Sequence, residues 1–393
     1  MEIFSKKLFL APIFLWTLFS LSVFAQDPDV PLIEQIEVLN NGVFLVKGEK
    51  MTLDSMDEVT KNVALLKRNQ KVESIYNEGI TYLSKNQYSE AIGFFDKVLT
   101  IDESFVKAYI NRGTAKKSLK NLEGALKDYL RATELDGQSE LAWLGVATIQ
   151  QEKKEFQEAI NSINKLLSIN PENAQAYHLK GMILFEKNNY QEALIEFDKA
   201  IAKDKKLVFA YNDRASSKRK LGDLQGALSD YQKAIELDAK SSFIFNNLGS
   251  LKVEMKDFEG AISAFSKAIE LQPDYYLAYN NRGNAKFEKG DYEGAEKDFS
   301  KALEIKPDYV FALNNRAVAK YKLKDYKGSV IDCDKAISIN PQYGSAYLNR
   351  GISKEMLRDF KGACQDWKKA GELGIKNGNI YLNNSNCDEH KVK

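Results

Sequence analysis

A small residue recurs at a constant interval through most of this 393-residue chain. Its nine positions are each 34 apart in numbering, without an insertion or deletion between them: Gly79, Gly113, Ala147, Gly181, Ala215, Gly249, Gly283, Ala317 and Gly351. A second small residue stands twelve positions after each of them: Ala91, Ala125, Ala159, Ala193, Ala227, Ala261, Ala295, Ser329 and Ala363. Such a strict period is the signature of a repeat architecture, in which each unit packs only against its neighbours. The sequence therefore predicts a stack of nine equivalent units rather than one globular core.

An aromatic residue usually stands four positions after the second small residue, at Phe95, Tyr129, Phe197, Tyr231, Phe265, Phe299 and Trp367. Ile163 and Cys333 take this place in the other two repeats, and Pro171, Pro273, Pro307 and Pro341 close four repeats. The pattern resembles the tetratricopeptide repeat (TPR), W-x2-L-G-x2-Y, then A-x3-F, then P. The string AYNNRGNAKFEKGDYEGAEKDFSKALEIKPDY is close to the family consensus. The resemblance covers about residues 72–377 and implies an all-α, right-handed solenoid of about nine helix-turn-helix repeats.

Elementary packing agrees with this resemblance. When each repeat is numbered from residue 72, the small residues fall at positions 8 and 20 and the aromatic at position 24. Small residues let two antiparallel helices approach closely, and the aromatic fills the space beside them. Near position 15, Asn86, Asn188, Gly222 and Gly290 are residues that favour a turn. Because one helix pair cannot bury its own apolar face, neighbouring repeats must supply the core.

Residues 1–25 are predicted to be a signal peptide. Lys6 and Lys7 precede an apolar run from Leu8 to Phe24, and Ala25 ends the stretch. The alternative is an uncleaved membrane anchor, but Pro12 interrupts the run, which is short for a bilayer about 30 Å thick. After cleavage we expect no stable membrane span, and we expect the protein to be periplasmic or secreted.

Residues 26–71 are predicted to form an N-terminal extension and a capping helix. Ile36–Leu39 and Val43–Val46 fit a small hairpin with a turn at residues 40–42. Ser55 and Glu58 have the spacing of a capping box, so we expect a separate helix to begin there. Residues 378–393 are expected to form a C-terminal tail that covers the last repeat.

Arginine recurs at position 7, and the same repeats have aspartate at position 23. The predicted ion pairs are Arg112–Asp128, Arg214–Asp230, Arg282–Asp298, Arg316–Asp332 and Arg350–Asp366. Lys180 and Glu196 replace the pair in the fourth repeat, and the three repeats without the cation also lack the acid. We therefore predict a structural pair, either within a repeat or across the next interface, rather than an anion-binding stripe.

Asparagine recurs at position 6, at Asn77, Asn111, Asn247, Asn281, Asn315 and Asn349, with no partner evident from the sequence. The resemblance to TPR proteins implies that this position faces the concave groove. A carboxamide both donates and accepts hydrogen bonds, so the row could bind a peptide backbone of any sequence. Phe209, Phe243 and Phe311 at position 2 would add apolar contacts. We expect alanine at all of the last four asparagines nearly to abolish binding and to leave folding nearly unchanged. The alternative is that the asparagines only stack helices locally or are solvated, and that the phenylalanines serve packing.

The composition favours a binding protein over an enzyme. Fifty-six basic residues balance 55 acidic residues, whereas binding to nucleic acid through bulk charge needs a basic excess. Two histidines are too few for a histidine-based metal site or a general-base system. We therefore predict no catalytic residue, no metal, no cofactor and no nucleic-acid partner.

The three cysteines lie late in the chain. Cys333 replaces a packing aromatic and is expected to be a buried thiol. Cys364 and Cys387 are candidates for a disulfide that staples the tail to the last repeat, or else they are free thiols.

The function predicted from the sequence is an exported scaffold for protein–protein interaction, with extended peptides in the concave groove. A cell-wall or glycan-binding module is the main alternative, because asparagines and aromatics also bind sugars. An enzyme is the weaker alternative, since it would need a cluster of titratable groups that the repeats do not single out.

Overall fold

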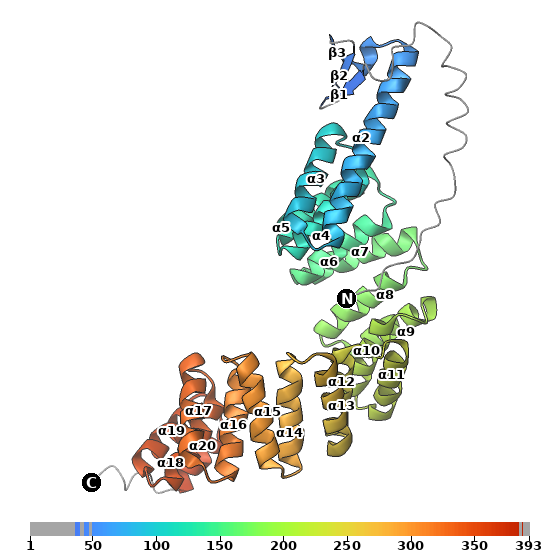
Figure 1. Ribbon diagram of the computed structural model, residues 1–393. Helices are drawn as coiled ribbons and strands as arrows, with labels where there is room; N and C mark the ends of the chain where they lie inside the picture. Colours follow the sequence, from blue (N-terminus) through green and yellow to red (C-terminus); the bar gives the residue numbers. More distant parts are fainter. Residues whose placement is uncertain (1–35, 40–42, 47–48, 385–386, 388–393) are drawn as a thin grey trace. The chain divides into compact units, whose positions relative to one another are not determined.

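The computed structural model describes residues 36–39, 43–46, 49–384 and 387 (Figure 1). The predicted signal peptide and the hairpin turn at 40–42 lie outside these residues. The rest of the chain falls into two compact units, one up to Ala176 and one from Tyr177.

The first unit combines a small sheet with helices. Its elements are β1 (Ile36–Val38), β2 (Val43–Val46), β3 (Glu49–Thr52), a 3-10 helix (Leu53–Ser55), α2 (Glu58–Ser84), α3 (Tyr88–Ile101), α4 (Val106–Ser118), α5 (Leu122–Leu135), α6 (Glu140–Glu152) and α7 (Phe156–Ile169). The next helix, α8 (Ala174–Glu186), begins at the boundary between the units.

The second unit consists of helices in its described part. They are α9 (Tyr190–Lys203), α10 (Val208–Lys220), α11 (Leu224–Leu237), α12 (Ser242–Glu254), α13 (Phe258–Leu271), α14 (Tyr276–Glu288), α15 (Tyr292–Ile305), α16 (Val310–Lys322), α17 (Tyr326–Ile339), α18 (Gly344–Met356), α19 (Phe360–Glu372) and α20 (Lys376–Asn384). The predicted all-α repeat fold is confirmed, with two helices in each repeat. We call them the first and the second helix of the repeat.

The predicted hairpin is also confirmed and gains a third strand. β1 and β2 pair antiparallel with Ile36 opposite Val46, and β2 pairs with β3. Phe44 is fully buried, and the sheet packs on α2. Two lysines of α2 cover β1: the Nζ atoms of Lys67 and Lys71 donate to the carbonyl oxygens of Ile36 and Val38 at 2.7 and 2.6 Å. This covers carbonyl groups that could otherwise pair with another strand.

The separate capping helix is a wrong prediction. The N-cap of α2 is Asp57, whose Oδ1 accepts from the backbone N–H of Thr60 at 2.9 Å. Ser55 instead bonds to Thr52 and closes the 3-10 turn. From Glu58 the helix continues for 27 residues through the start of the first repeat, because no glycine or proline interrupts it before Gly79. The N-terminal cap and the first helix of repeat 1 are therefore one element.

The turn between the two helices of each repeat uses a left-handed residue at position 15. Gly222 and Gly290 have φ of 86° and 90° there. The other seven repeats place an asparagine, a lysine or an arginine at φ between 59° and 65°. The two helices of every repeat thus meet at the same tight turn, whether or not the residue there favours a left-handed backbone.

The core lies where the small residues meet the aromatic at position 24. A Cβ added to Gly283 would lie 2.7 Å from the ring of Phe299, which is itself 1% exposed. In repeat 7 the ring therefore occupies the space that a side chain at residue 283 would need. The predicted close approach of the two helices is confirmed.

Candidate functional site

The first helices of successive repeats lie side by side in the second unit, α10 beside α12, then α14, α16 and α18. Positions 2, 6 and 9 are three or four residues apart, so they fall on one side of each helix. We call these three positions the first-helix face. It contains the asparagines and phenylalanines that the sequence predicts to bind a ligand.

Four of the six asparagines at position 6 are not free, contrary to the expectation from the sequence. Each of these four donates from Nδ2 to the Oδ1 of an asparagine at position 5 of the preceding repeat. The links are Asn247 to Asn212 at 3.0 Å, Asn281 to Asn246 at 3.0 Å, Asn315 to Asn280 at 3.1 Å and Asn349 to Asn314 at 2.8 Å. The acceptors are buried, at 4–8% exposure, and the donors are partly buried. We call this set of bonds the amide ladder.

We call position 5 of one repeat together with position 6 of the next the slot between their first helices. Nearer the N-terminus, other residues occupy this slot. His178 Nε2 lies 2.7 Å from Asp213 Oδ2, and Asn111 Nδ2 donates to the hydroxyl of Tyr76 at 2.7 Å. The slot between repeats 2 and 3 has Ile110 at position 5 and Gly145 at position 6. Asn77 is exposed in the first repeat. In the slots of His178 and Asn111, polar residues 35 positions apart thus face each other, and the sequence shows the residues at positions 5 and 6 but not that they meet.

The expectation that alanine at the four asparagines would leave folding unchanged is therefore wrong. Removing Asn281 would leave the Oδ1 of Asn246 without its donor while Asn246 is 8% exposed. An unpaired buried acceptor destabilises a fold by about 1–3 kcal/mol. The amides hold successive first helices together, in addition to any contact with a ligand.

The phenylalanines at position 2 lie partly in solvent. Phe209 is 54% exposed and stacks on Phe243 with ring centroids 5.7 Å apart. Phe311 is 55% exposed and contacts Tyr309 and Tyr343, both at 5.6 Å. These rings form two apolar clusters beside the amide ladder. They are the candidate contacts for a ligand on this face.

The predicted ion pairs are present in all five repeats, and each is bidentate. Arg282 donates from Nε and Nη2 to the two oxygens of Asp298 at 2.9 and 2.7 Å. The other four guanidinium groups hold their aspartates in the same way, at 2.5–2.9 Å. The aspartates are buried, at 2–4% exposure. The fork of arginine matches a carboxylate in this geometry, so the pair fixes the angle between the two helices of a repeat.

A lysine at position 11 contacts the aspartate of each pair, and this lysine was not predicted from the sequence. Lys286 Nζ lies 2.9 Å from Asp298, and Lys116, Lys218, Lys320 and Lys354 make equivalent contacts. We call the arginine, lysine and aspartate a charged node. Its members stand at positions 7, 11 and 23 of the repeat.

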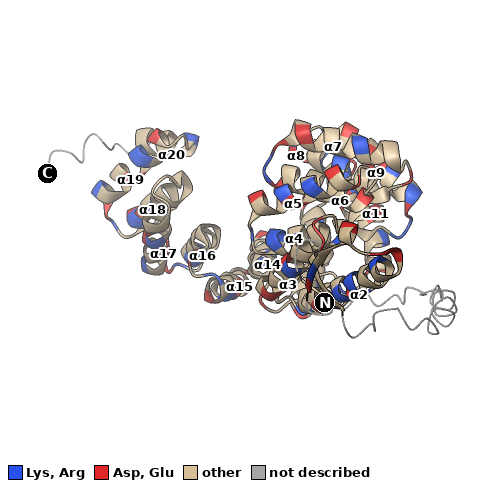
Figure 2. Ribbon diagram, turned by 90° about the horizontal axis from the view of Figure 1, so that it is seen from above, with Lys and Arg blue, Asp and Glu red and all other residues tan. Residues whose placement is uncertain are grey.

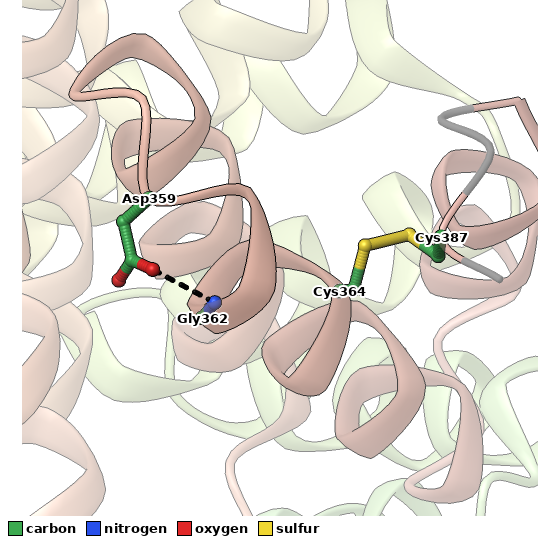
Figure 3. The surroundings of a disulfide bond; sticks show 4 residues. All are labelled: Asp359, Gly362, Cys364 and Cys387. Carbon is green, nitrogen blue, oxygen red and sulfur yellow. Dashed lines mark hydrogen bonds between the residues drawn. A yellow bond between two sulfur atoms is a disulfide. The ribbon is translucent and has the colours of Figure 1, made fainter. Parts of the chain in front are cut away.

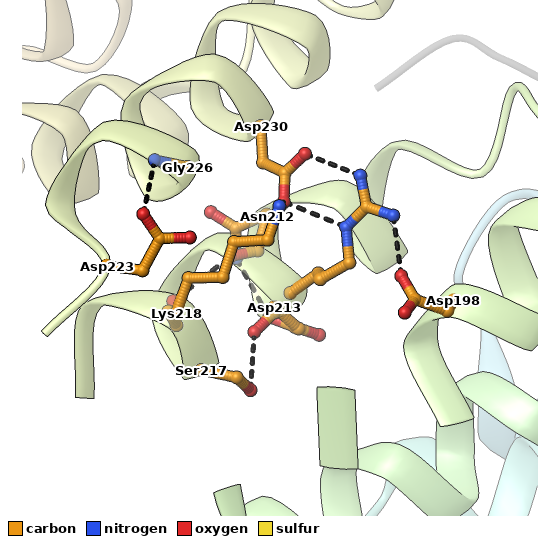
Figure 4. Close-up of polar contacts among 10 residues, drawn as sticks. Asp198, Asn212, Asp213, Ser217, Lys218, Asp223, Gly226 and Asp230 are labelled. Carbon is orange, nitrogen blue, oxygen red and sulfur yellow. Dashed lines mark hydrogen bonds and ion pairs between the residues drawn. The ribbon is translucent and has the colours of Figure 1, made fainter. Parts of the chain in front are cut away.

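The arginine also bonds to the second helix of the preceding repeat. In the node of repeat 5, the guanidinium of Arg214 lies 2.5 Å from Asp230 and 2.7 Å from Asp198. Figure 4 labels the two aspartates and Lys218 of this node. Burial alone would lower the pKa of Arg214, but the hydrogen bonds and charges of the two aspartates outweigh it and raise the pKa. The predicted pair thus lies within the repeat, and the contact across the interface is made with a different acid, Asp198, at position 25 of repeat 4.

Repeat 4 has an incomplete node. Lys180 lies 3.5 Å from Glu196 Oε1, and Lys199 lies 2.9 Å from the same oxygen. Glu196 Oε2 is buried and has no hydrogen-bond partner among the residues that the structure describes. Position 11 of this repeat is Leu184, so the second cation of the other nodes is missing.

Cys364 and Cys387 form a disulfide (Figure 3). It attaches the chain beyond α20 to α19, and α20 packs against α19 with Tyr381 stacked on Trp367 at 5.2 Å. Cys333 is a buried free thiol, and burial raises its pKa to about 12.

Two kinds of feature are absent from the described residues. No group of three or more His, Cys, Asp or Glu side chains there is arranged to hold a metal ion. No helix there is both long and apolar enough to cross a bilayer.

Comparisons with known proteins agree with the fold. Models described as tetratricopeptide repeat match residues 72–105, 106–139, 147–207, 210–241, 276–309 and 312–343, and a TPR repeat model matches 249–289. A search of curated proteins gives no match.

Solved structures show the same architecture. The APC/C hetero-tetramer Cut9–Hcn1 aligns with a TM-score of 0.54 at 15% identity, over 80% of this chain and 76% of that chain. A TPR protein from Parabacteroides merdae aligns with a TM-score of 0.50 at 21% identity, over 63% of this chain and 99% of that chain. At these identities the likeness concerns the fold alone. Together, the repeat models cover more than half of the residues, and the chain belongs to the tetratricopeptide repeat family.

Proposed function

We propose that this protein is an exported scaffold that binds extended peptide segments of partner proteins along its first-helix face. Membership of the TPR family supports a role in protein–protein interaction. The observation that carries the proposal is the exposure of Phe209 and Phe311, each within a cluster of aromatic rings. Contiguous apolar groups left in water on an ordered surface are typical of interaction sites.

The amide ladder supports the peptide as ligand. The ladder uses the Nδ2 atoms, while the Oδ1 atoms of Asn247, Asn315 and Asn349 have no hydrogen-bond partner in the described part of the chain. Such oxygens can accept from the backbone N–H groups of an extended segment. The role proposed is binding without catalysis, and it needs no cofactor.

Export is proposed from the apolar N-terminal run with its two lysines, and the disulfide is compatible with it. Disulfides persist in oxidising compartments such as a periplasm or the extracellular space. The mass of the protein recovered from its own cell envelope tests this: a mature chain that begins at Gln26 is expected. A chain that retains Met1 in the cytoplasm would contradict export.

Binding is tested by crosslinking and pulldown of the mature chain from its own envelope fraction. The double variant Phe209→Ser/Phe311→Ser is expected to lose the captured proteins. A matched control is Ile195→Ser/Ile331→Ser, which removes two exposed side chains, at 47% and 64% exposure, from second helices. If both variants captured the same proteins in equal amounts, the first-helix face would be ruled out as the binding site. Capture of purified wall polymer instead of protein would favour the glycan-binding alternative.

A further inference from the structure

The first-helix face of repeats 6–9 contains no charged residue. Position 9 has Ser250, Asn284, Val318 and Ile352, position 6 has the four asparagines of the ladder, and position 2 has Phe243, Leu277, Phe311 and Ser345. All twelve lie in the described part of the chain and reach solvent to some extent. The chain as a whole is 28% charged, and its helices carry charges of both signs (Figure 2).

The arginines next to the ladder asparagines are already bound elsewhere. Arg282, Arg316 and Arg350 follow the ladder asparagines directly, but their guanidinium groups are engaged with the buried aspartates of the nodes. Glu254, Glu288 and Lys322 stand at position 13, one turn beyond position 9 on the same side and at the ends of the first helices, so the uncharged stretch runs from position 2 to position 9. A segment lying along the face would therefore meet amides, hydroxyls and apolar groups rather than a counter-charge.

This lack of charge selects the ligand. A carboxylate or ammonium group that loses water on this face would find no opposite charge, and desolvation of an unpaired charge is costly. A neutral backbone would lose less, because the ladder offers carbonyl oxygens for its N–H groups. The exposed rings offer contact area for apolar side chains.

The repeat spacing sets the pattern of such a ligand. Packed helices lie about 8–10 Å apart, and an extended chain advances about 3.3 Å per residue. About three residues of ligand therefore pass each repeat. The stacked rings of Phe209 and Phe243, 5.7 Å apart, show that position 2 side chains of repeats 5 and 6 are in contact.

We propose that the first-helix face of repeats 6–9 selects an uncharged extended peptide segment with a large apolar side chain at about every third residue. The selectivity rests on the proposed peptide binding and adds the chemistry of the partner. Because no ion pair forms, the affinity does not depend on salt.

The test is selection of a phage-displayed random library, about 12 residues long so that it spans four repeats, on the mature chain. The enriched peptides are then synthesised with a fluorophore, and their affinities are measured by anisotropy at low and high salt. We expect sequences without Asp, Glu, Lys or Arg between the apolar residues. Their affinity should change less than about twofold between about 50 and 500 mM NaCl, since only charge pairs are screened.

The variant Phe243→Ser/Phe311→Ser should bind the selected peptides at least about tenfold more weakly, since buried aromatics dominate binding energy. Ile331→Ser is the matched control, and melting curves confirm that both variants fold. Enrichment of charged peptides, or an affinity that falls steeply with salt, would overturn the proposed selectivity. Peptide binding on this face would still stand if the double variant failed to bind the enriched peptides. Peptides that bind both variants equally would overturn the site itself, and with it the selectivity.

Discussion

Repeats 5–9 and repeats 1–3 follow the same period but fill the slot between successive first helices differently. In repeats 5–9 every slot contains an asparagine pair with a buried acceptor. In the described part of repeats 1–3, one slot has a hydrogen bond from Asn111 to Tyr76, and Ile110 and Gly145 take the next slot. The 34-residue period therefore fixes how successive repeats stack, whereas the residues that fill the slot between their first helices vary. A polar row is thus a feature of one region, where it also makes the exposed face neutral.

The largest expected effect comes from breaking the whole ladder. The quadruple variant N247A/N281A/N315A/N349A leaves four buried acceptors without donors. We expect a loss of about 4–12 kcal/mol in urea unfolding, at about 1–3 kcal/mol per link. The control is Asn111→Ala, whose partner Tyr76 is only partly buried, so its hydroxyl can bond to water. A quadruple variant as stable as the parent would show that the asparagines act only on ligands.

The second prediction contrasts a charged node with the apolar residues of repeat 6. Asp298→Ala removes the acid that Arg282 and Lys286 share, and we expect a loss of about 3–5 kcal/mol. Replacing the node by the residues of repeat 6 at positions 7 and 23, in Arg282→Leu/Asp298→Ala, should recover most of this loss, because Leu248 and Ala264 pack there without charges. Urea unfolding of the single and double variants measures both values.

The same node predicts the outcome of a charge swap. In Arg282→Asp/Asp298→Arg, the new arginine would lie beside Lys286, so the melting temperature should not be restored. A simple two-residue pair, as expected from the sequence, would allow rescue. Full rescue by the swap would therefore show that Lys286 contributes nothing to the node.

The third prediction concerns the incomplete node of repeat 4. Lys180→Arg/Glu196→Asp gives this repeat the pair found in repeat 5, and it removes the buried Oε2 that lacks a partner. We expect a gain of about 1 kcal/mol, the size of one satisfied buried hydrogen bond, measured by thermal unfolding. A loss of stability would mean that the backbone of repeat 4 no longer fits the bidentate geometry.

The smallest effect is expected at the turns. Lys256 has a φ of 61°, which a side chain disfavours, so Lys256→Gly should stabilise by about 0.5–1 kcal/mol. Gly290→Ala, at a φ of 90°, should destabilise by at least as much. Equal melting temperatures for parent and both variants would show that the turn tolerates any residue.

The sequence by itself determined the period, the helix pairs, the glycine and aromatic contacts within a repeat, and the partners of the position 7 arginines. These features connect residues of one repeat, where helix geometry and a short turn leave little freedom, so spacing in the sequence translates directly into distance. The disulfide between Cys364 and Cys387 was one of two sequence alternatives, and only the packing of α20 on α19 brings the two cysteines together.

Tertiary structure alone decided which residue faces which across repeats. The partner of Asn281 is Asn246, because neighbouring first helices are offset so that position 6 of one meets position 5 of the other. The sequence permits the continuous helix from Glu58 to Ser84, because no glycine or proline stands before Gly79, and the sheet and the first repeat then each bury part of it. Local sequence patterns predict which face of a helix is polar. The offset between two packed helices depends on all the side chains between them. Because of this offset, the asparagines predicted to be free bond to one another.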